Sequence, residues 1–153
     1  THIVAAALME TGIDYRTVNK VFFRTKSRKR LALEADMLTN LEYFDRERVA
    51  FLYVPRSLMA RIQATESDAE ELSSLGAQIQ GVDCAVTFRE LGEGEWKLSV
   101  RTGERVNATE VCRLLGGGGH ARAAGATVEH VTQAEAEEKM LSAIAQIVPD
   151  FKK

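Results

Sequence analysis

At residues 116–125 the sequence reads Gly-Gly-Gly-Gly-His-Ala-Arg-Ala-Ala-Gly. Glycine loses more backbone entropy on folding than any other residue, so a folded domain keeps such a run where the backbone turns or approaches something closely. The His120, Arg122 and alanines that follow predict a loop that leads into a short helical turn. The backbone N–H groups at the start of that turn would point outward, because they have no partner within a helix.

This stretch has two interpretations. Glycine runs form flexible hinges and tight connections, and that explanation needs no ligand. Unpaired N–H groups at a helix start also bind anions, because the helix dipole favours negative charge there. His120 and Arg122 add side-chain donors, and an arginine can bind phosphate through two parallel hydrogen bonds. The sequence therefore predicts a phosphate or carboxylate site, with a hinge as the alternative.

The composition is that of an ordinary water-soluble domain, since 45% of the 153 residues are hydrophobic and 27% are charged. A net charge of -2 gives no overall attraction to nucleic acid or to an acidic membrane. No apolar run approaches the roughly 20 residues that span a bilayer. Cys84 and Cys112 lack the spacing of a metal site or a disulfide framework. We therefore expect a cytoplasmic protein with two reduced, buried thiols and no membrane contact.

Residues 2–39 predict three amphipathic helices, of which Asp14 caps the second and Ser27 begins the third. This leading block has little core of its own, so it needs something else to pack on. Its apolar face predicts pairing into a homodimer where no other domain covers it.

Between residues 16 and 30 the chain has seven basic residues and no acidic one. Such a run is usually a solvated helix face. The alternative is a contact surface for nucleic acid, which would make this stretch an autonomous nucleic-acid-binding module.

From residue 41 the pattern changes to an α/β arrangement. Strands are expected at residues 41–44, 49–54, 82–89, 96–101 and 126–129, with the second apolar on both faces and therefore central. Capping boxes predict helix starts at Ser67 with Glu70 and at Thr132 with Glu135. The predicted fold is α/β (α+β), a mixed sheet of about five strands with flanking helices, preceded by a helical lead-in.

The strand at residues 96–101 carries a second anion-binding feature. Its period of two places Trp96, Leu98 and Val100 on one face. Ser99 and Arg101 therefore share the other face. A strand, a helix and a glycine loop in this order can return the loop to the end of the strand, where α/β proteins bind ligands.

The stretches Lys97-Leu98-Ser99-Val100-Arg101-Thr102 and Gly116–Gly125 resemble the paired signatures of the DHH-associated domain, the C-terminal half of the DHH-type phosphoesterases. The similarity is greatest to the subgroup that degrades very short RNAs and removes phosphate from 3′-phosphoadenosine 5′-phosphate. Residues 9–14, 64–68 and 81–86 resemble that subgroup in the same order.

The resemblance implies a division of labour. In this family a separate N-terminal domain holds two metal ions, usually manganese, and the associated domain clamps the substrate across a cleft. This chain has no Asp-His-His motif, so the resemblance implies no cofactor in the chain itself and a missing catalytic domain as its partner. Residues 1–40 would be the end of that domain and a linker, and residues 41–153 the substrate-binding domain.

The same resemblance implies roles for individual residues. Gly117, Gly118, Gly119 and His120 would contact the substrate phosphate, and Arg101 would pair with it. Ser99 and Arg122 would support these contacts. The expected substrate is a short RNA or a nucleoside phosphate, which this chain alone would bind weakly and not hydrolyse.

Overall fold

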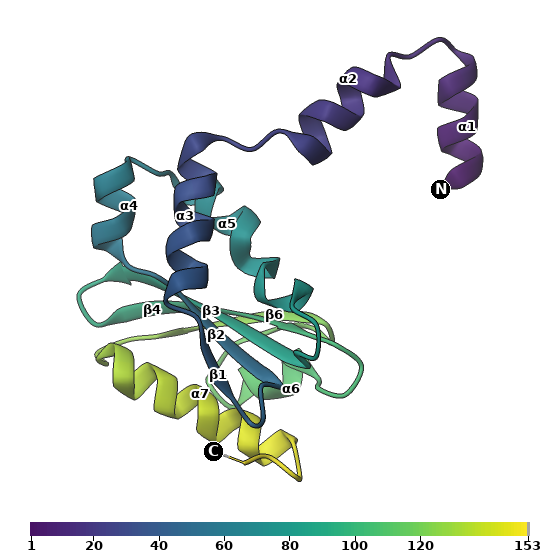
Figure 1. The fold of residues 1–153 in the computed structure, drawn as a ribbon. Coiled ribbons are helices and arrows are strands. Elements are labelled where there is room, and N and C mark those ends of the chain that lie inside the picture. The colour runs from purple at the N-terminus through teal and green to yellow at the C-terminus, as the bar shows by residue number, and fades with distance from the viewer. Residues whose placement is uncertain (153) are drawn as a thin grey trace.

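The computed structural model describes residues 1–152 and shows a six-stranded mixed sheet between two layers of helices (Figure 1). The strands are β1 (Glu42–Phe44), β2 (Val49–Val54), β3 (Cys84–Gly92), β4 (Glu95–Thr102), β5 (Gly118–His120) and β6 (Ala123–Val128). The α-helices are α1 (His2–Glu10), α2 (Tyr15–Asn19), α3 (Arg28–Thr39), α4 (Arg56–Ile62), α5 (Glu66–Glu70), α6 (Ala108–Arg113) and α7 (Gln133–Ile147). A π-helical segment η1 (Lys20–Arg24) and two 3₁₀ segments, η2 (Glu71–Ser74) and η3 (Gly76–Gln78), complete the order.

The sheet order is β1-β2-β3-β4-β6-β5, with β2 and β3 parallel and every other pair antiparallel. All six residues of β2 are buried, which confirms the predicted central strand. Phe51 belongs to the core beneath α6 and α7, whereas Leu52 belongs to the core beneath α3, α4 and α5. The α/β class is therefore confirmed, with six strands in place of about five.

Helix α3 belongs to the second of these cores. Leu33 and Met37 are fully buried against β2 and α4. Ser27 caps this helix by accepting a hydrogen bond from the Arg30 N–H, as predicted. Helix α3 therefore packs on the sheet, whereas α1 and α2 do not. The domain boundary at residue 40 stays a prediction.

Helices α1 and α2 stand away from the sheet (Figure 1) and contain no buried residue. Asp14 caps α2 through the Thr17 N–H, as predicted. The apolar side chains of Phe22 and Phe23, in η1, are more than two-thirds exposed. Within residues 1–152 no helix is both long and apolar enough to cross a lipid bilayer.

The glycine run differs from its predicted structure. It forms β5, which pairs with β6, so the segment is a hairpin closed by Ala121 and Arg122 and not a loop into a helical turn. Glycine allows this because β5 lies very close to β6: a Cβ on Gly119 would lie 2.6 Å from the Cα of Ala124. Gly119 also has a φ of 146°, which other residues rarely adopt.

One capping box also lies two residues earlier than the sequence predicted. Helix α5 begins at Glu66, and its box joins Thr65 to Asp68, with the Thr65 N–H donating to the carboxylate over 2.8 Å. Two overlapping S/T-x-x-acid patterns compete here, and Glu70 forms an ion pair with Lys97 instead of capping. The box at Thr132 and Glu135 is confirmed.

The two cysteines should be unreactive in the folded protein. Cys84 and Cys112 are free and fully buried, as predicted, and burial raises the pKa of their thiols to about 12 and about 11 respectively. Since the thiolate is the nucleophile, both should stay unmodified by a thiol reagent at about pH 8 and react together after unfolding in urea. Absorbance of the released chromophore measures this. Rapid labelling of one native thiol would contradict it.

Candidate phosphate-binding site

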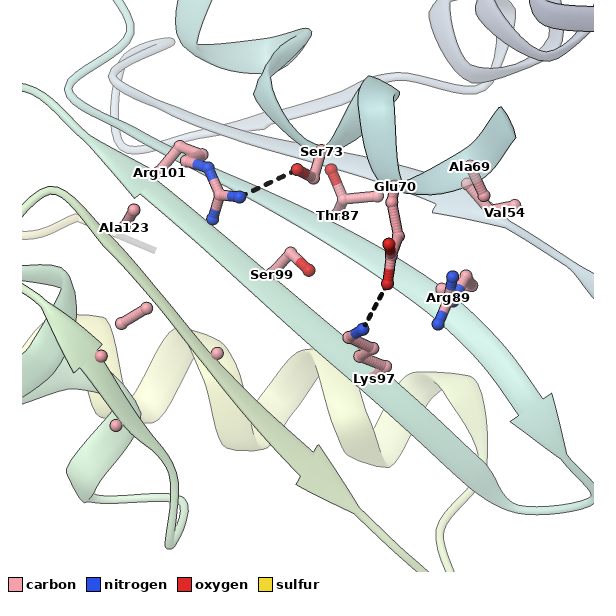
Figure 2. A pocket seen from close by; sticks show the side chains of 14 residues that line it. Val54, Ala69, Glu70, Ser73, Thr87, Arg89, Lys97, Ser99, Arg101 and Ala123 are labelled. Atoms are coloured by element: carbon pink, nitrogen blue, oxygen red, sulfur yellow. Dashed lines mark hydrogen bonds and ion pairs between the residues drawn. The ribbon is translucent and has the colours of Figure 1, made fainter. Parts of the chain in front are cut away.

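An open cavity of about 390 Å³ lies on the face of the sheet that also carries α5 and η2 (Figure 2). Strands β3 and β4 form its floor, η2 contacts both strands, and β5 and β6 supply a wall of glycine and alanine. The lining residues with polar side chains are Glu70, Ser73, Thr87, Arg89, Lys97, Ser99 and Arg101.

The alternation of β4 places its polar side chains in this cavity. Ser99 and Arg101 both line it, which confirms their shared face, while Leu98 and Val100 are buried in the core on the other side. Strand β3 lies alongside in antiparallel register, so Thr87 faces Ser99 and Arg89 faces Lys97. Directly opposed residues point to the same side of a sheet, and the two strands therefore present one continuous polar surface.

The three cations of the cavity differ in their partners. Arg89 forms an ion pair with Glu66 over 2.6 Å, and Lys97 forms one with Glu70 over 3.2 Å. Arg101 instead donates to two neutral oxygens. One is Ser73 Oγ at 2.9 Å (Figure 2), and the other is the carbonyl of Val100 at 3.1 Å. Within the part of the chain that the structure describes, no carboxylate lies in ion-pair range of Arg101. Its charge is thus available to an anion in the cavity.

The glycine run contributes to the cavity only in part. Gly118 and Gly119 line it, and a Cβ on Gly118 would meet no atom within 4 Å. Gly117 does not line it, because this residue packs against the backbone of Gly125. The absence of a side chain at Gly118 leaves the wall open to a ligand.

His120 and Arg122 lie outside the lining. His120 is exposed at the end of β5, in register with Ala123 and through it with Arg101, so it lies on the same face at the edge of the sheet. The Arg122 guanidinium donates to the carbonyl of Gly103 and is engaged there. Of the seven predicted site residues, the structure brings Ser99, Arg101, Gly118 and Gly119 together at one cavity.

Sequence reasoning missed several lining residues. Thr87 and Arg89 could have been found from the period of two along β3, combined with the register of the hairpin. Ser73, which holds Arg101, lies 28 residues before it in a 3₁₀ segment. No local pattern marks this pair.

The cavity is suited to binding an anion. Among the described lining residues none is a histidine or a cysteine, and the carboxylate of Glu70 is paired with Lys97. Among residues 1–152 no three His, Cys, Asp or Glu side chains cluster in a way that could hold a metal ion. The donor set of this part of the chain therefore fits phosphate recognition and does not fit a two-metal centre.

Comparisons with known proteins agree with this fold. The chain is 35% identical over 81 residues to the bifunctional oligoribonuclease and PAP phosphatase NrnA of Thermus thermophilus, an alignment that covers 53% of this chain and 25% of NrnA. An exopolyphosphatase-related protein of Bacteroides fragilis superimposes with a TM-score of 0.83 at 21% identity, over 95% of this chain and 42% of that one. The pGpG-specific phosphodiesterase PggH of Vibrio cholerae gives a TM-score of 0.52 at 12% identity, over 80% of this chain and 40% of its own.

These two structures share the fold of this chain. The chain spans about a quarter of the length of NrnA. The family model described as the DHHA1 domain matches residues 47–150, which include every strand from β2 to β6 and the whole cavity. The chain therefore belongs to the DHHA1 domain family.

Proposed function

We propose that this chain is the phosphate-clamping, substrate-binding half of a metal-dependent phosphoesterase that hydrolyses short oligoribonucleotides or nucleoside phosphates. The observation that carries the proposal is Arg101, which has no carboxylate partner among the side chains that the structure describes and lines an open cavity with Gly118. The similarity to NrnA supports the class of substrate.

In the proposed complex, one phosphate of the substrate binds at the Arg101 guanidinium. Ser73 Oγ and the Val100 carbonyl hold two of its nitrogens and so fix the orientation of the planar group. Ser99, on the same strand, would donate a hydroxyl hydrogen bond to the same phosphate. An oriented guanidinium loses little side-chain entropy on binding, which favours affinity.

The metal chemistry would come from a separate catalytic domain, with manganese as the proposed ion. The exposed apolar residues of the lead-in support a contact between α1, α2 and that domain. Leu8, Met9 and Ile13 form part of an apolar groove there. When this chain is alone, the same surface would bind a second copy, and light scattering would report the dimer.

Hydrolysis of a short oligoribonucleotide with manganese tests the proposal. We expect turnover by a protein extended N-terminally with the catalytic domain, and none by residues 1–153. The proposal is wrong if the extended protein is inactive. It is equally wrong if both Arg101→Ala and His120→Ala leave the activity of that protein unchanged.

The alternative, nucleic-acid binding by residues 16–30, predicts a different pattern. In this stretch Lys26 and Arg30 are already paired with Glu34, and Lys29 donates to the Gln63 carbonyl. Binding through the remaining basic residues would fall more steeply with salt, because more phosphate contacts release more counterions.

A further inference from the structure

A second open cavity, of about 520 Å³, lies where the end of α3, the start of β1 and the start of α7 meet. Its described lining residues include two carboxylates, Asp36 and Glu42, and none of them is a lysine, an arginine or a histidine. Asp36 is already paired with Arg61 from outside the lining, over 3.2 Å. Glu42 forms no ion pair with any residue that the structure describes. The cavity therefore carries an unbalanced negative charge.

The hydroxyl group of Tyr53, which also lines this cavity, has no hydrogen-bond partner. Tyr53 is 6% exposed, and its Oη is one of the buried side-chain atoms left unpaired among the described residues. The ring stacks on Phe88, with ring centroids 5.5 Å apart, so the hydroxyl group cannot easily move to find a partner. Buried polar groups in native proteins are nearly always hydrogen-bonded. The unpaired oxygen therefore indicates a ligand or a bound water molecule at this position.

Two carboxylates lie close to this hydroxyl group. Burial raises the pKa of the Tyr53 phenol, and the negative charges of Glu137 and Glu42 raise it further. Neither carboxylate is in hydrogen-bond geometry with Oη. Glu137, like Glu42, has no ion-pair partner in the described part of the chain. The phenol and the two carboxylates thus form an acidic group that lacks a cation.

The strand register explains why these side chains meet. Glu42 is opposed to Phe51, and Tyr53 follows two residues later on β2, so Glu42 and Tyr53 lie on the sheet face that carries α6 and α7. From α7, Gln133 lines the cavity and donates to Glu137 over 2.8 Å. The Tyr53 hydroxyl group therefore faces the cavity between β1 and α7. The phosphate-binding cavity lies on the opposite face of the sheet, so this site does not depend on the proposed function.

We propose that this cavity binds a guanidinium group carried on a short alkyl chain. Two parallel N–H groups of the guanidinium donate to the Glu42 carboxylate, and a third N–H donates to Tyr53 Oη. Glu137 adds negative charge. A guanidinium is always charged and is more weakly hydrated than an ammonium group, which suits a partly buried site. Leu41 and Pro55 also line the cavity and contact the alkyl chain.

Titration of the 153-residue chain with n-propylguanidine, followed by two-dimensional ¹H–¹⁵N NMR at constant ionic strength, tests the site. We expect shifts localised at the backbone amides of Glu42, Tyr53 and Gln133, with a Kd of about 1 mM or below for so small a ligand. n-Propylamine is the matched ligand with an ammonium group. It should bind at least about three-fold more weakly, because it cannot form the parallel pair of hydrogen bonds.

Two variants each remove one proposed contact. Tyr53→Phe keeps the ring and removes the hydroxyl group, so propylguanidine should bind about three- to ten-fold more weakly. Its urea midpoint should equal or exceed that of the parent, because a buried unpaired hydroxyl group is lost. Glu42→Gln removes the charge and should weaken binding at least about ten-fold. Tyr43→Phe is the matched control, since Tyr43 lies on the other face of β1 and is 43% exposed, and it should leave the affinity unchanged.

Three outcomes would overturn the proposal. The first is the absence of localised shifts up to about 20 mM propylguanidine, well above the expected Kd. The second is equal affinity of Tyr53→Phe and the parent, which would assign the unpaired oxygen to a water molecule. The third is equal affinity for propylamine, which would show that the cavity recognises charge alone.

The guanidinium could come from a free small molecule or from an arginine of another protein, and a peptide distinguishes these sources. The probe is glycyl-arginyl-glycine with both ends blocked, titrated in the same way. Binding at least about ten-fold tighter than that of propylguanidine assigns the site to an arginine side chain, because only the peptide adds backbone contacts. Equal or weaker binding assigns it to a small alkylguanidine.

Discussion

Replacement of Arg101 by alanine should weaken the binding of adenosine 5′-monophosphate to this chain by about 10- to 100-fold. A hydrogen bond between charged groups contributes about 1.5–3 kcal/mol, and 1.4 kcal/mol corresponds to a factor of ten. Neither Lys97 nor Arg89 is expected to replace the lost positive charge, because both are paired with carboxylates. Isothermal titration calorimetry at constant ionic strength measures the effect.

Two controls accompany this variant. Arg101→Lys keeps the charge but loses the planar pair of donors, so its affinity should lie between those of the parent and of Arg101→Ala. Joint neutralisation of Arg16, Arg24 and Arg28 should leave the affinity almost unchanged. If the triple variant abolishes binding and Arg101→Ala does not, the basic stretch at residues 16–30 is the binding surface.

Gly117→Ala should lower the free energy of unfolding by about 3 kcal/mol, the upper end of the usual cost of overpacking. The added methyl group would collide with the carbonyl oxygen of Gly125 and lie 2.7 Å from the Cα of Ala126. Both are backbone atoms of β6, so a side-chain rotation cannot relieve the contact. Relief requires β5 to move away from β6, which also displaces the glycine wall of the cavity.

Gly118→Ala is the matched control for that variant. A methyl group there meets no atom within 4 Å, so the change in stability should stay within about 0.5 kcal/mol. Urea unfolding of both variants, followed by circular dichroism, measures the difference. Equal midpoints for the two alanine variants would show that β5 is not held tightly against β6.

The sequence predicted those parts of the fold whose signals are local. The apolar residues of β2 required a central strand, and the period of two in β4 placed Ser99 beside Arg101. Both features follow from side-chain alternation within one strand, and the structure confirms both.

The glycine segment could not be predicted in the same way. All three residues of β5 are exposed, so the strand has no alternation, and glycine does not favour strands on its own. Its pairing depends on the small residues Ala124 and Gly125 of β6, which permit the close approach. The contact of Ser73 with Arg101 likewise joins distant segments and appears only after folding.

The two outer strands of the sheet, β1 and β5, have three residues each, whereas the four inner strands have six to nine. An exposed strand edge invites pairing with another polypeptide, and a short edge limits the number of hydrogen bonds that such pairing can form. The glycine-rich rim beside the cavity is therefore a poor template for intermolecular β-aggregation. This side of the cavity can therefore stay uncovered and accessible to a ligand without exposing a long strand edge to pairing with another chain.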